Sequence, residues 1–347
     1  MTVISIGSDR SLFKPGSAAR VRAAAYAEAL GELHIIVFAL RAHQLQPAHA
    51  GPLHLYPTDS RSRLGFVFDA ARLARRMPGE VITVQDPFES GLAGILGRKH
   101  RPLHVQLHTD PFAPAFRASL LNRIRLMIAP YVFTRAAGIR TLTETLKGEI
   151  ARVYQPKAPI SVLPIYVDLA RFSSVNRVPE PGNLLFVGRL EWEKDPFLAL
   201  EAFAKARKEG VEAHLTFLGD GSLRQALEKR AAHLGIREAV AFFGQSDPVP
   251  EFARAALLLA TSRYEGYGLA IVEALAARVA VLSTDVGVAR EAGAIISTPE
   301  TFADTLIALL RAGLQAGHLA SYPYRDFEHY LAAYVADIEQ CANQSLV

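Results

Sequence analysis

The feature that most constrains the fold of this chain is a repeated alternation between short apolar runs and segments with helical spacing, such as Ala18–Leu30 and Pro196–Lys208. Strands that are apolar along their whole length and alternate with helices predict parallel sheets covered on both faces. Two successive series of such strands predict two doubly wound α/β domains. The first series is Val3–Gly7, His34–Leu40, Val81–Gln85, Leu103–His108 and Gly138–Thr143, and the second is Leu184–Gly188, His214–Gly219, Val240–Gly244, Leu257–Ser262 and Val279–Thr284.

The length of 347 residues also fits about two domains. The polar segment Ser173–Gly182 contains two prolines and a glycine, which is typical of a linker between domains. We therefore expect one domain over residues 1–172 and another over residues 173–326. The remaining segment, 327–347, begins with apolar residues at helical spacing and is expected to form a final helix.

The single cysteine, Cys341, excludes a disulfide framework within the chain and a cysteine-based metal cage. It fits a reducing, cytoplasmic setting. The first predicted strand begins almost at Met1, so we expect no signal peptide. No uncharged apolar run approaches the ~18 residues that a membrane-spanning helix needs.

The net charge of +4 is unevenly distributed along the chain. Residues 1–172 hold 22 Lys and Arg against 12 Asp and Glu, a net charge of +10. The rest of the chain holds 16 against 22, a net charge of −6. This division indicates that the first half faces something anionic, such as a membrane surface, a phosphorylated acceptor or nucleic acid.

The most informative motif runs from Ser262 to Leu275 and joins a predicted strand to a predicted helix. Its glycines, Gly266 and Gly268, let the backbone approach a ligand closely, and a helix that begins after them offers free N–H groups to a phosphate. Glu273 is the only charged residue between Glu265 and Arg278, and burying an unpaired carboxylate is costly. We therefore expect Glu273 to face polar partners.

These residues carry a resemblance to family 4 of the retaining glycosyltransferases. Glu265, followed by Gly-Tyr-Gly-Leu and by Glu273 eight positions later, resembles the signature of that family. The segments Gly188–Asp195 and Leu218–Gly221 resemble its "GRL…EKG" loop and its "GxG" turn, with Asp195 in place of the usual glycine. Thr284–Glu291 resembles an abbreviated "DVGGxxE" segment. The resemblance extends over most of the chain and is most specific over residues 183–291.

The resemblance implies a GT-B fold, with two doubly wound Rossmann-like domains whose parallel sheets face each other across a cleft. The domain over 173–326 would bind a nucleotide-sugar donor, the domain over 1–172 would bind the acceptor, and the final helix would cross back to the acceptor domain. Arg189 and Lys194 would bind the donor diphosphate, Glu265 would hold the donor sugar, and Glu273 would accept from the ribose hydroxyls. The other donor-binding residues implied are Gly16, Gly188, Gly219, Phe243, Gly244, Tyr267, Gly268 and Leu269.

Weaker marks lie in the first half of the chain. His108 ends a predicted strand, and the His-Thr-Asp context resembles the position at which the family contacts the donor sugar. Asp86, Glu89 and Asp110 follow predicted strands, where acceptor-side residues lie in doubly wound sheets. Thr143-Glu144 resembles a pair of the family that follows a strand, although it also fits a helix cap.

The chemistry implied needs no metal and no cofactor beyond the nucleotide-sugar co-substrate, because nothing in the chain resembles an Asp-x-Asp metal clamp. Retention of anomeric configuration follows from the family, as does an acceptor that is a saccharide or is linked to a lipid. A UDP- or GDP-hexose donor and a role in surface polysaccharide or glycolipid synthesis are the corresponding expectations.

One segment of the first half points to a membrane. Residues 111–135 contain four arginines and no glutamate or aspartate, and Leu120, Leu121, Ile124, Met127 and Ile128 fall at helical spacing. Such a basic amphipathic helix is typical of proteins that lie on an anionic bilayer, which would place the protein at the inner face of the cell membrane. A helix that faces the core with a solvated basic side is the alternative.

Three other functions are compatible with parts of the pattern. An epimerase or a glycogen-type synthase would use the same fold and donor, and a degenerate scaffold would keep the fold without the chemistry. The intact set of Arg189, Lys194, Glu265 and Glu273 disfavours the scaffold. A nucleic-acid-binding protein is disfavoured because the basic residues lack interleaved aromatic residues and a known motif.

Overall fold

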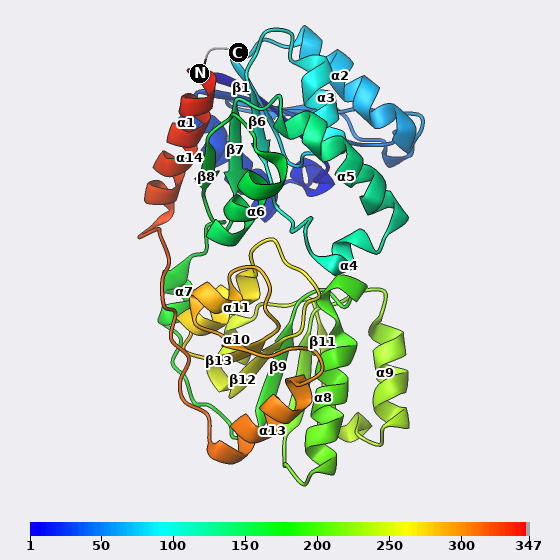
Figure 1. Cartoon of the computed structure of the whole chain (residues 1–347), viewed down its shortest axis with the longest axis vertical. Helices are drawn as coiled ribbons and strands as arrows, with labels where there is room; N and C mark the ends of the chain where they lie inside the picture. Colours follow the sequence, from blue (N-terminus) through cyan, green and yellow to red (C-terminus); the bar gives the residue numbers. More distant parts are fainter. Residues whose placement is uncertain (345–347) are drawn as a thin grey trace. The chain divides into compact units, whose positions relative to one another are not determined.

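A computed structural model describes residues 1–344 and divides into two compact α/β units (Figure 1). The first unit contains residues 1–164 and 324–344, and the second contains residues 165–323. The boundary thus lies before the expected linker. Residues of that segment belong to the second unit, since the backbone N–H groups of Val178 and Glu180 donate to the carbonyls of Ala253 and Arg254, each at 2.9 Å.

The sheet of the first unit has eight strands over the described residues, in the order β3-β4-β2-β1-β5-β6-β7-β8. All neighbouring pairs are parallel except β3 with β4. The short strands β3, β4 and β8 were not predicted from the apolar runs. The strands are β1 (Thr2–Gly7), β2 (Glu32–Val37), β3 (Ala48–Ala50), β4 (Leu53–Pro57), β5 (Val81–Val84), β6 (Leu103–Gln106), β7 (Gly138–Thr141) and β8 (Ile160–Val162).

Helices cover both faces of this sheet (Figure 1). Helix α2 packs on α3 and α3 packs on α5 along one face, while α1 and α14 lie together on the other. The helices are α1 (Ala18–Leu30), α2 (Phe66–Arg76), α3 (Glu89–Gly97), α4 (Pro114–Arg117), α5 (Leu120–Phe133), α6 (Glu144–Tyr154) and α14 (Phe327–Ala342), joined in part by the 3-10 turns η1 (Arg10–Phe13), η2 (Arg41–His43) and η3 (Arg63–Gly65).

A buried arginine fastens the final helix to the sheet of the first unit. The Arg140 guanidinium donates to the carbonyl of Leu163 at 2.9 and 3.0 Å and to Gln106 Oε1 at 3.2 Å. It also donates to the hydroxyl of Tyr330 on α14, at 3.3 Å, and lies 5.2 Å from the ring centroid of Tyr334. Arg140 is only 2% exposed, so water can reach little of its guanidinium group. These contacts therefore provide the hydrogen bonds that a buried charge requires.

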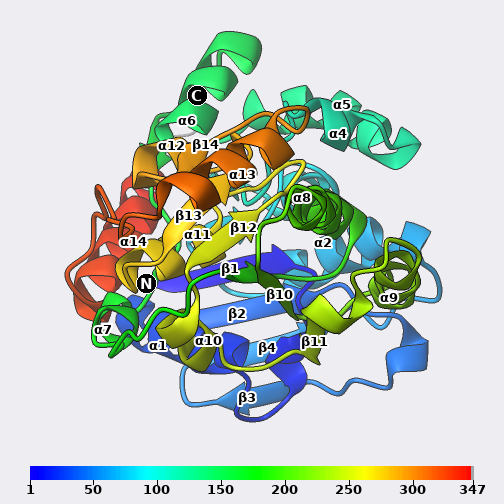
Figure 2. The ribbon, with the colours of Figure 1, turned by 90° about the horizontal axis from the view of Figure 1, so that it is seen from below.

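The sheet of the second unit has six strands in the described chain, all parallel, in the order β11-β10-β9-β12-β13-β14. Helices α8, α9 and α13 bury apolar side chains against one face, and α11 lies beside β12 and β13 (Figure 2). The strands are β9 (Asn183–Val187), β10 (His214–Leu218), β11 (Val240–Gly244), β12 (Leu257–Ala260), β13 (Ala280–Ser283) and β14 (Ile295–Ile296). The helices are α7 (Leu169–Ser173), α8 (Pro196–Lys208), α9 (Arg224–His233), α10 (Val249–Arg254), α11 (Leu269–Ala276), α12 (Ala289–Ala292) and α13 (Phe302–Ala312).

The strand order of each sheet contains one point where the direction of winding reverses. In the first unit this point lies between β1 and β5, and in the second between β9 and β12. Ligands of open α/β sheets bind outside the carboxyl ends of the strands at such points. The loops that follow these four strands are therefore where a site is expected.

None of the helices within residues 1–344 is long and apolar enough to cross a membrane.

Candidate active site

An ion pair joins the two loops that flank the reversal point of the second sheet. Lys194 belongs to the loop that follows β9, and its ammonium contacts Oε1 of Glu265 in the loop that follows β12. The same carboxylate oxygen accepts from the hydroxyl of Ser262 at 2.7 Å. Lys194 is 23% exposed and Glu265 is 16% exposed, so the pair is shielded but still open to a ligand.

Further contacts hold these two loops in register. The hydroxyl of Thr261 donates to the carbonyl of Asp195 at 2.9 Å, and the guanidinium of Arg263 pairs with the Asp195 carboxylate at 2.6 Å. Asp195, which replaces the glycine of the family pattern, adopts a left-handed φ of 43°. The Asp195 carboxylate thus forms an ion pair with Arg263 that a glycine at this position could not form.

Arg189 lies at the outer side of the same loop. Its guanidinium pairs with Glu193 at 2.5 Å, and its side chain is 71% exposed. The loop after β9 thus holds two cations, an exposed arginine and a partly buried lysine, each of them paired with a glutamate. Two such cations are suited to an anion with several oxygens, such as a diphosphate.

Glu273 lies in α11, between buried neighbours such as Val272 and Ala274. Its carboxylate has no hydrogen-bond or ion-pair partner among residues 1–344. Burial raises its pKa, the positive charge of Arg171 lowers it, and the negative charge of Asp247 raises it further. Keeping a carboxylate there costs stability, and hydroxyl donors from a ligand would offset that cost.

The glycine turns after β9 and β10 bring two backbone segments into direct contact. Gly219 has φ of +145°, and a Cβ atom added there would lie 1.9 Å from the carbonyl oxygen of Gly188. Gly219 also forms an isolated bridge with Gly244 at the end of β11. A side chain at position 219 would prevent this close approach of the two backbone segments.

The remaining predicted donor-binding residues lie in the same unit. Phe243 near the end of β11 is 51% exposed and lies 5.9 Å, centroid to guanidinium carbon, from Arg254. Gly268, with φ of +101°, caps the start of α11, and Leu269 is its first residue. Tyr267 is buried, and its carbonyl accepts from the N–H of Val288.

In the first unit, His108 follows β6 at the carboxyl edge of the sheet. Its Nε2 lies 3.0 Å from Oε1 of Gln85, an oxygen that only accepts, so Nε2 donates and Nδ1 is left as an acceptor. Burial lowers the pKa of His108 to about 3, with further lowering from the charges of Arg140 and His104. His108 is therefore neutral at physiological pH, and its ring can interact through hydrogen bonds rather than through charge.

The three acidic residues predicted for the acceptor side each have a local partner. Asp86 accepts from the N–H groups of Phe88 and Ser90 at the start of α3, and burial raises its pKa. Asp110 accepts from backbone N–H groups two and three positions later, and burial also raises its pKa. Glu89 pairs with Arg125 of α5 at 2.9 Å.

Two smaller expectations concern turns. Gly16, with φ of +73°, lies in the exposed turn between η1 and α1, after β1. Thr143 caps α6 by accepting from the N–H of Leu146 at 3.2 Å. Over the described residues, no three His, Cys, Asp or Glu side chains are grouped closely enough to hold a metal ion.

Sequence reasoning missed two residues beside Glu273. Arg171 of α7 pairs with Asp247 at 2.6 Å, and both influence the ionisation of Glu273. Neither residue belongs to a motif, and they are 76 positions apart in the chain, so only the packing of α7 against α11 reveals their role.

Comparison with known proteins identifies the class. The family model described as Glycosyl transferases group 1 matches residues 170–311, and the model of Glycosyltransferase Family 4 matches residues 19–171. The chain belongs to family 4 of the glycosyltransferases, of the GT-B type, which confirms the resemblance. Glycogen synthase of Mycobacterium tuberculosis is 32% identical over 173 residues, which cover 48% of this chain and 42% of that protein. The chain thus spans less than half of this curated relative.

Solved structures confirm the fold class, a GT-B arrangement of two Rossmann-like domains. Sucrose-phosphate synthase from Thermosynechococcus elongatus superposes with a TM-score of 0.71 at 15% identity, covering 99% of this chain and 92% of that chain. Alr3699/HepE of Anabaena, in complex with UDP and glucose, gives a TM-score of 0.66 at 18% identity, covering 100% and 95%.

Replacing Glu273 by Gln should stabilise the free protein at neutral pH. A carboxyl whose pKa is raised by folding contributes stability below its unfolded pKa and loses it as the pH rises through its folded pKa. At pH 7 the wild-type protein therefore carries the cost of the charged form, and Glu273→Gln removes it. We expect a gain of about 0.5–2 kcal/mol in the free energy of unfolding, measured by thermal denaturation.

The gain should disappear at pH values below the unfolded pKa of the carboxyl, where Glu273 is protonated in both states. Glu238→Gln is the matched control because Glu238 is exposed on the same unit. A Glu273→Gln protein that is less stable than wild type at neutral pH would contradict this account of the site.

Proposed function

We propose that the protein is a retaining glycosyltransferase that moves a hexose-type sugar from a UDP- or GDP-sugar to a saccharide or lipid-linked acceptor. The observation that carries the proposal is Glu273, a half-buried carboxylate without a partner in the described chain, on the helix that starts at the reversal point of the second sheet. A nucleotide would supply partners for both kinds of charged side chain in this region. Its ribose hydroxyls can donate to Glu273, and its phosphates can accept from Arg189 and Lys194.

Each of the proposed donor-binding residues contacts a different part of the nucleotide-sugar. Arg189 and Lys194 bind the diphosphate and stabilise the negative charge that develops on the departing nucleotide. Glu273 accepts from the ribose, and Phe243 lies against the base. Glu265 accepts from hydroxyls of the donor sugar while it orients Lys194, so one carboxylate links sugar recognition to the charge at the leaving group.

The first unit is proposed to hold the acceptor. Neutral His108 fits the contact with the donor sugar that the family resemblance implies, because its Nδ1 can accept from a sugar hydroxyl. The two cations stand in for a metal ion at the leaving group, so we propose that turnover needs no metal. The departing phosphate would assist attack on the same face of the sugar, and an inverted product in the NMR spectrum would contradict that step.

Binding to an anionic membrane is the second part of the proposal. The exposed fractions of the apolar side chains on α5 are 73% for Leu120, 53% for Leu121, 51% for Ile124 and 80% for Met127. These side chains therefore do not face the core of the unit. Arg123 lies on α5 and Arg135 two residues beyond its end, so this segment combines apolar and basic groups as interfacial helices do.

A thermal-shift panel with UDP, GDP and ADP tests the donor site. A ligand that binds only the folded state raises Tm, and we expect one nucleotide to do so in the presence of EDTA. Arg189→Ala, at an exposed position that the fold tolerates, should abolish most of the shift. Lys205→Ala removes an exposed lysine elsewhere in the unit and should leave the shift unchanged. No shift with any nucleotide, or a shift that requires a divalent cation, would contradict the proposal.

Vesicle co-sedimentation tests the membrane surface. Wild-type protein should sediment with anionic vesicles at low salt, and Leu121→Gln with Met127→Gln should lower the affinity by about tenfold or more, because two inserted apolar side chains are lost. Val178→Gln is the control, since Val178 is 71% exposed in the second unit. Equal sedimentation of both variants with the wild type would argue against α5 as the contact.

A further inference from the structure

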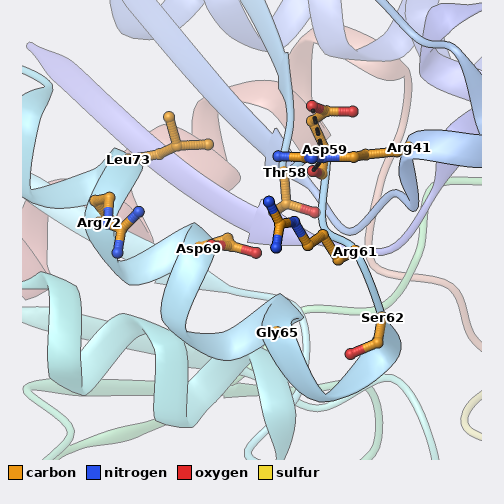
Figure 3. Close-up of a pocket in the computed structure, with 9 residues that line it drawn as sticks. All are labelled: Arg41, Thr58, Asp59, Arg61, Ser62, Gly65, Asp69, Arg72 and Leu73. Atoms are coloured by element: carbon orange, nitrogen blue, oxygen red, sulfur yellow. Dashed lines mark hydrogen bonds and ion pairs between the residues drawn. The ribbon is translucent and has the colours of Figure 1, made fainter.

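A cavity of about 550 Å³ opens in the first unit, away from the residues described above (Figure 3). Three segments line it: the start of η2 after β2, the loop after β4, and the first turns of α2. They bring Arg41, Arg61 and Arg72 to one hollow. The volume falls within the range of roughly 300–1,000 Å³ that is typical of small-molecule sites.

Hydrogen bonds and one ion pair hold the frame of this cavity. Nε of Arg41 lies 3.4 Å from Oδ2 of Asp59 and donates to the carbonyl of the same residue at 3.1 Å. Asp69 accepts from the hydroxyl of Ser60 at 2.7 Å. The side chain of Thr58 exchanges hydrogen bonds with the backbone of Ala39, which fixes the loop after β4 to the loop after β2.

Two of the three arginines remain without a partner. Within residues 1–344, neither Arg61 nor Arg72 makes a hydrogen bond or an ion pair. With three arginines and two aspartates the lining carries a formal charge of +1. The guanidinium groups without an ion-pair partner are those of Arg61 and Arg72. Guanidinium groups favour planar, bidentate contacts with phosphate and carboxylate oxygens. Both side chains are exposed, so their donors are open to such an oxyanion.

The place of the cavity in the sheet connects it to the acceptor side. It lies at the carboxyl ends of β2 and β4, the same edge at which Gly16 follows β1 and Asp86 follows β5. Strand β4 is two positions from β1, and neighbouring strands lie ~4.8 Å apart, so the cavity lies about 10 Å along the edge from the end of β1. A group bound here would therefore lie away from the end of β1.

We propose that this cavity binds an oxyanion, a phosphate or a carboxylate, carried by the saccharide acceptor, and that it selects anionic acceptors over neutral ones. This inference rests on the proposed function for the identity of the ligand as an acceptor. Arg61 and Arg72 hold the oxyanion, Arg41 is kept in place by Asp59, and the Ser62 hydroxyl at the rim can donate to the sugar.

Calorimetric titration of the full chain without nucleotide tests the cavity. The probes are glucose 6-phosphate and glucuronate, with glucose as the neutral counterpart. Wild-type protein should bind at least one anion about tenfold or more tightly than glucose, because a hydrogen bond to a charged group is stronger than one between neutral groups. The double variant Arg61→Ala with Arg72→Ala should lose that preference.

Two controls locate the binding. Arg63→Ala removes an exposed arginine between the two that does not line the cavity, and it should keep the preference. Arg189→Ala empties the proposed diphosphate site and should also keep it. Binding that survives the double variant, binding that Arg189→Ala abolishes, or no anion binding up to ~10 mM would each overturn the proposal.

The test is independent of the donor site. The double variant should retain the thermal shift with nucleotide that wild type shows, since both arginines lie in the first unit. A failure of the donor assay with intact anion binding would refute the proposed function alone. An intact thermal shift with nucleotide, together with no anion binding in the cavity, would refute only the proposal of an anionic acceptor.

Discussion

Parallel pairing is the constraint on which the rest of this structure depends. Because every strand of the second sheet, and all but β3 of the first, runs in the same direction as its neighbours, the carboxyl ends of the strands share one edge in each unit. The loops that leave this edge carry Lys194 and Glu265 in the second unit, although these two residues are far apart in the chain, and His108 in the first unit. The reversal of strand order then selects which two loops meet, and in the second unit the ion pair of Lys194 with Glu265 joins those two.

The second unit keeps features that cost stability where a donor would bind. Glu273 is a carboxylate without a partner in the described chain, and the turns at Gly219 and Gly188 give up side chains so that backbones can touch. Arg140 shows the opposite solution in the first unit, since its buried charge is surrounded by carbonyl, amide and phenol groups. A charge with several hydrogen-bond partners fastens α14 to its sheet, whereas a charge without one is available to a ligand.

Much of this arrangement could be predicted from the sequence, because periodicity and local motifs encode it. The helix bounds expected at Ala18–Leu30 and Pro196–Lys208 match the structure, and the motif residues of the second unit lie on its strand ends. Strand β4 was missed because histidine and tyrosine interrupt its apolar pattern. Helical spacing on α5 could not decide whether its apolar side meets the core or the solvent. The arginines of the cavity come from separate segments, so no linear pattern contains them.

If Glu273 accepts from the ribose of a donor nucleotide, as we propose, then removing the ribose hydroxyls should weaken binding. The affinity of the protein for the preferred nucleoside diphosphate should be compared with that for its 2′,3′-dideoxy analogue, in wild type and in Glu273→Gln. We expect wild type to prefer the ribose form by about tenfold or more, and Glu273→Gln to lower this preference markedly, because an anionic acceptor makes stronger hydrogen bonds to the hydroxyls than an amide does. Equal affinity of the wild-type protein for the two nucleotides would contradict this proposal.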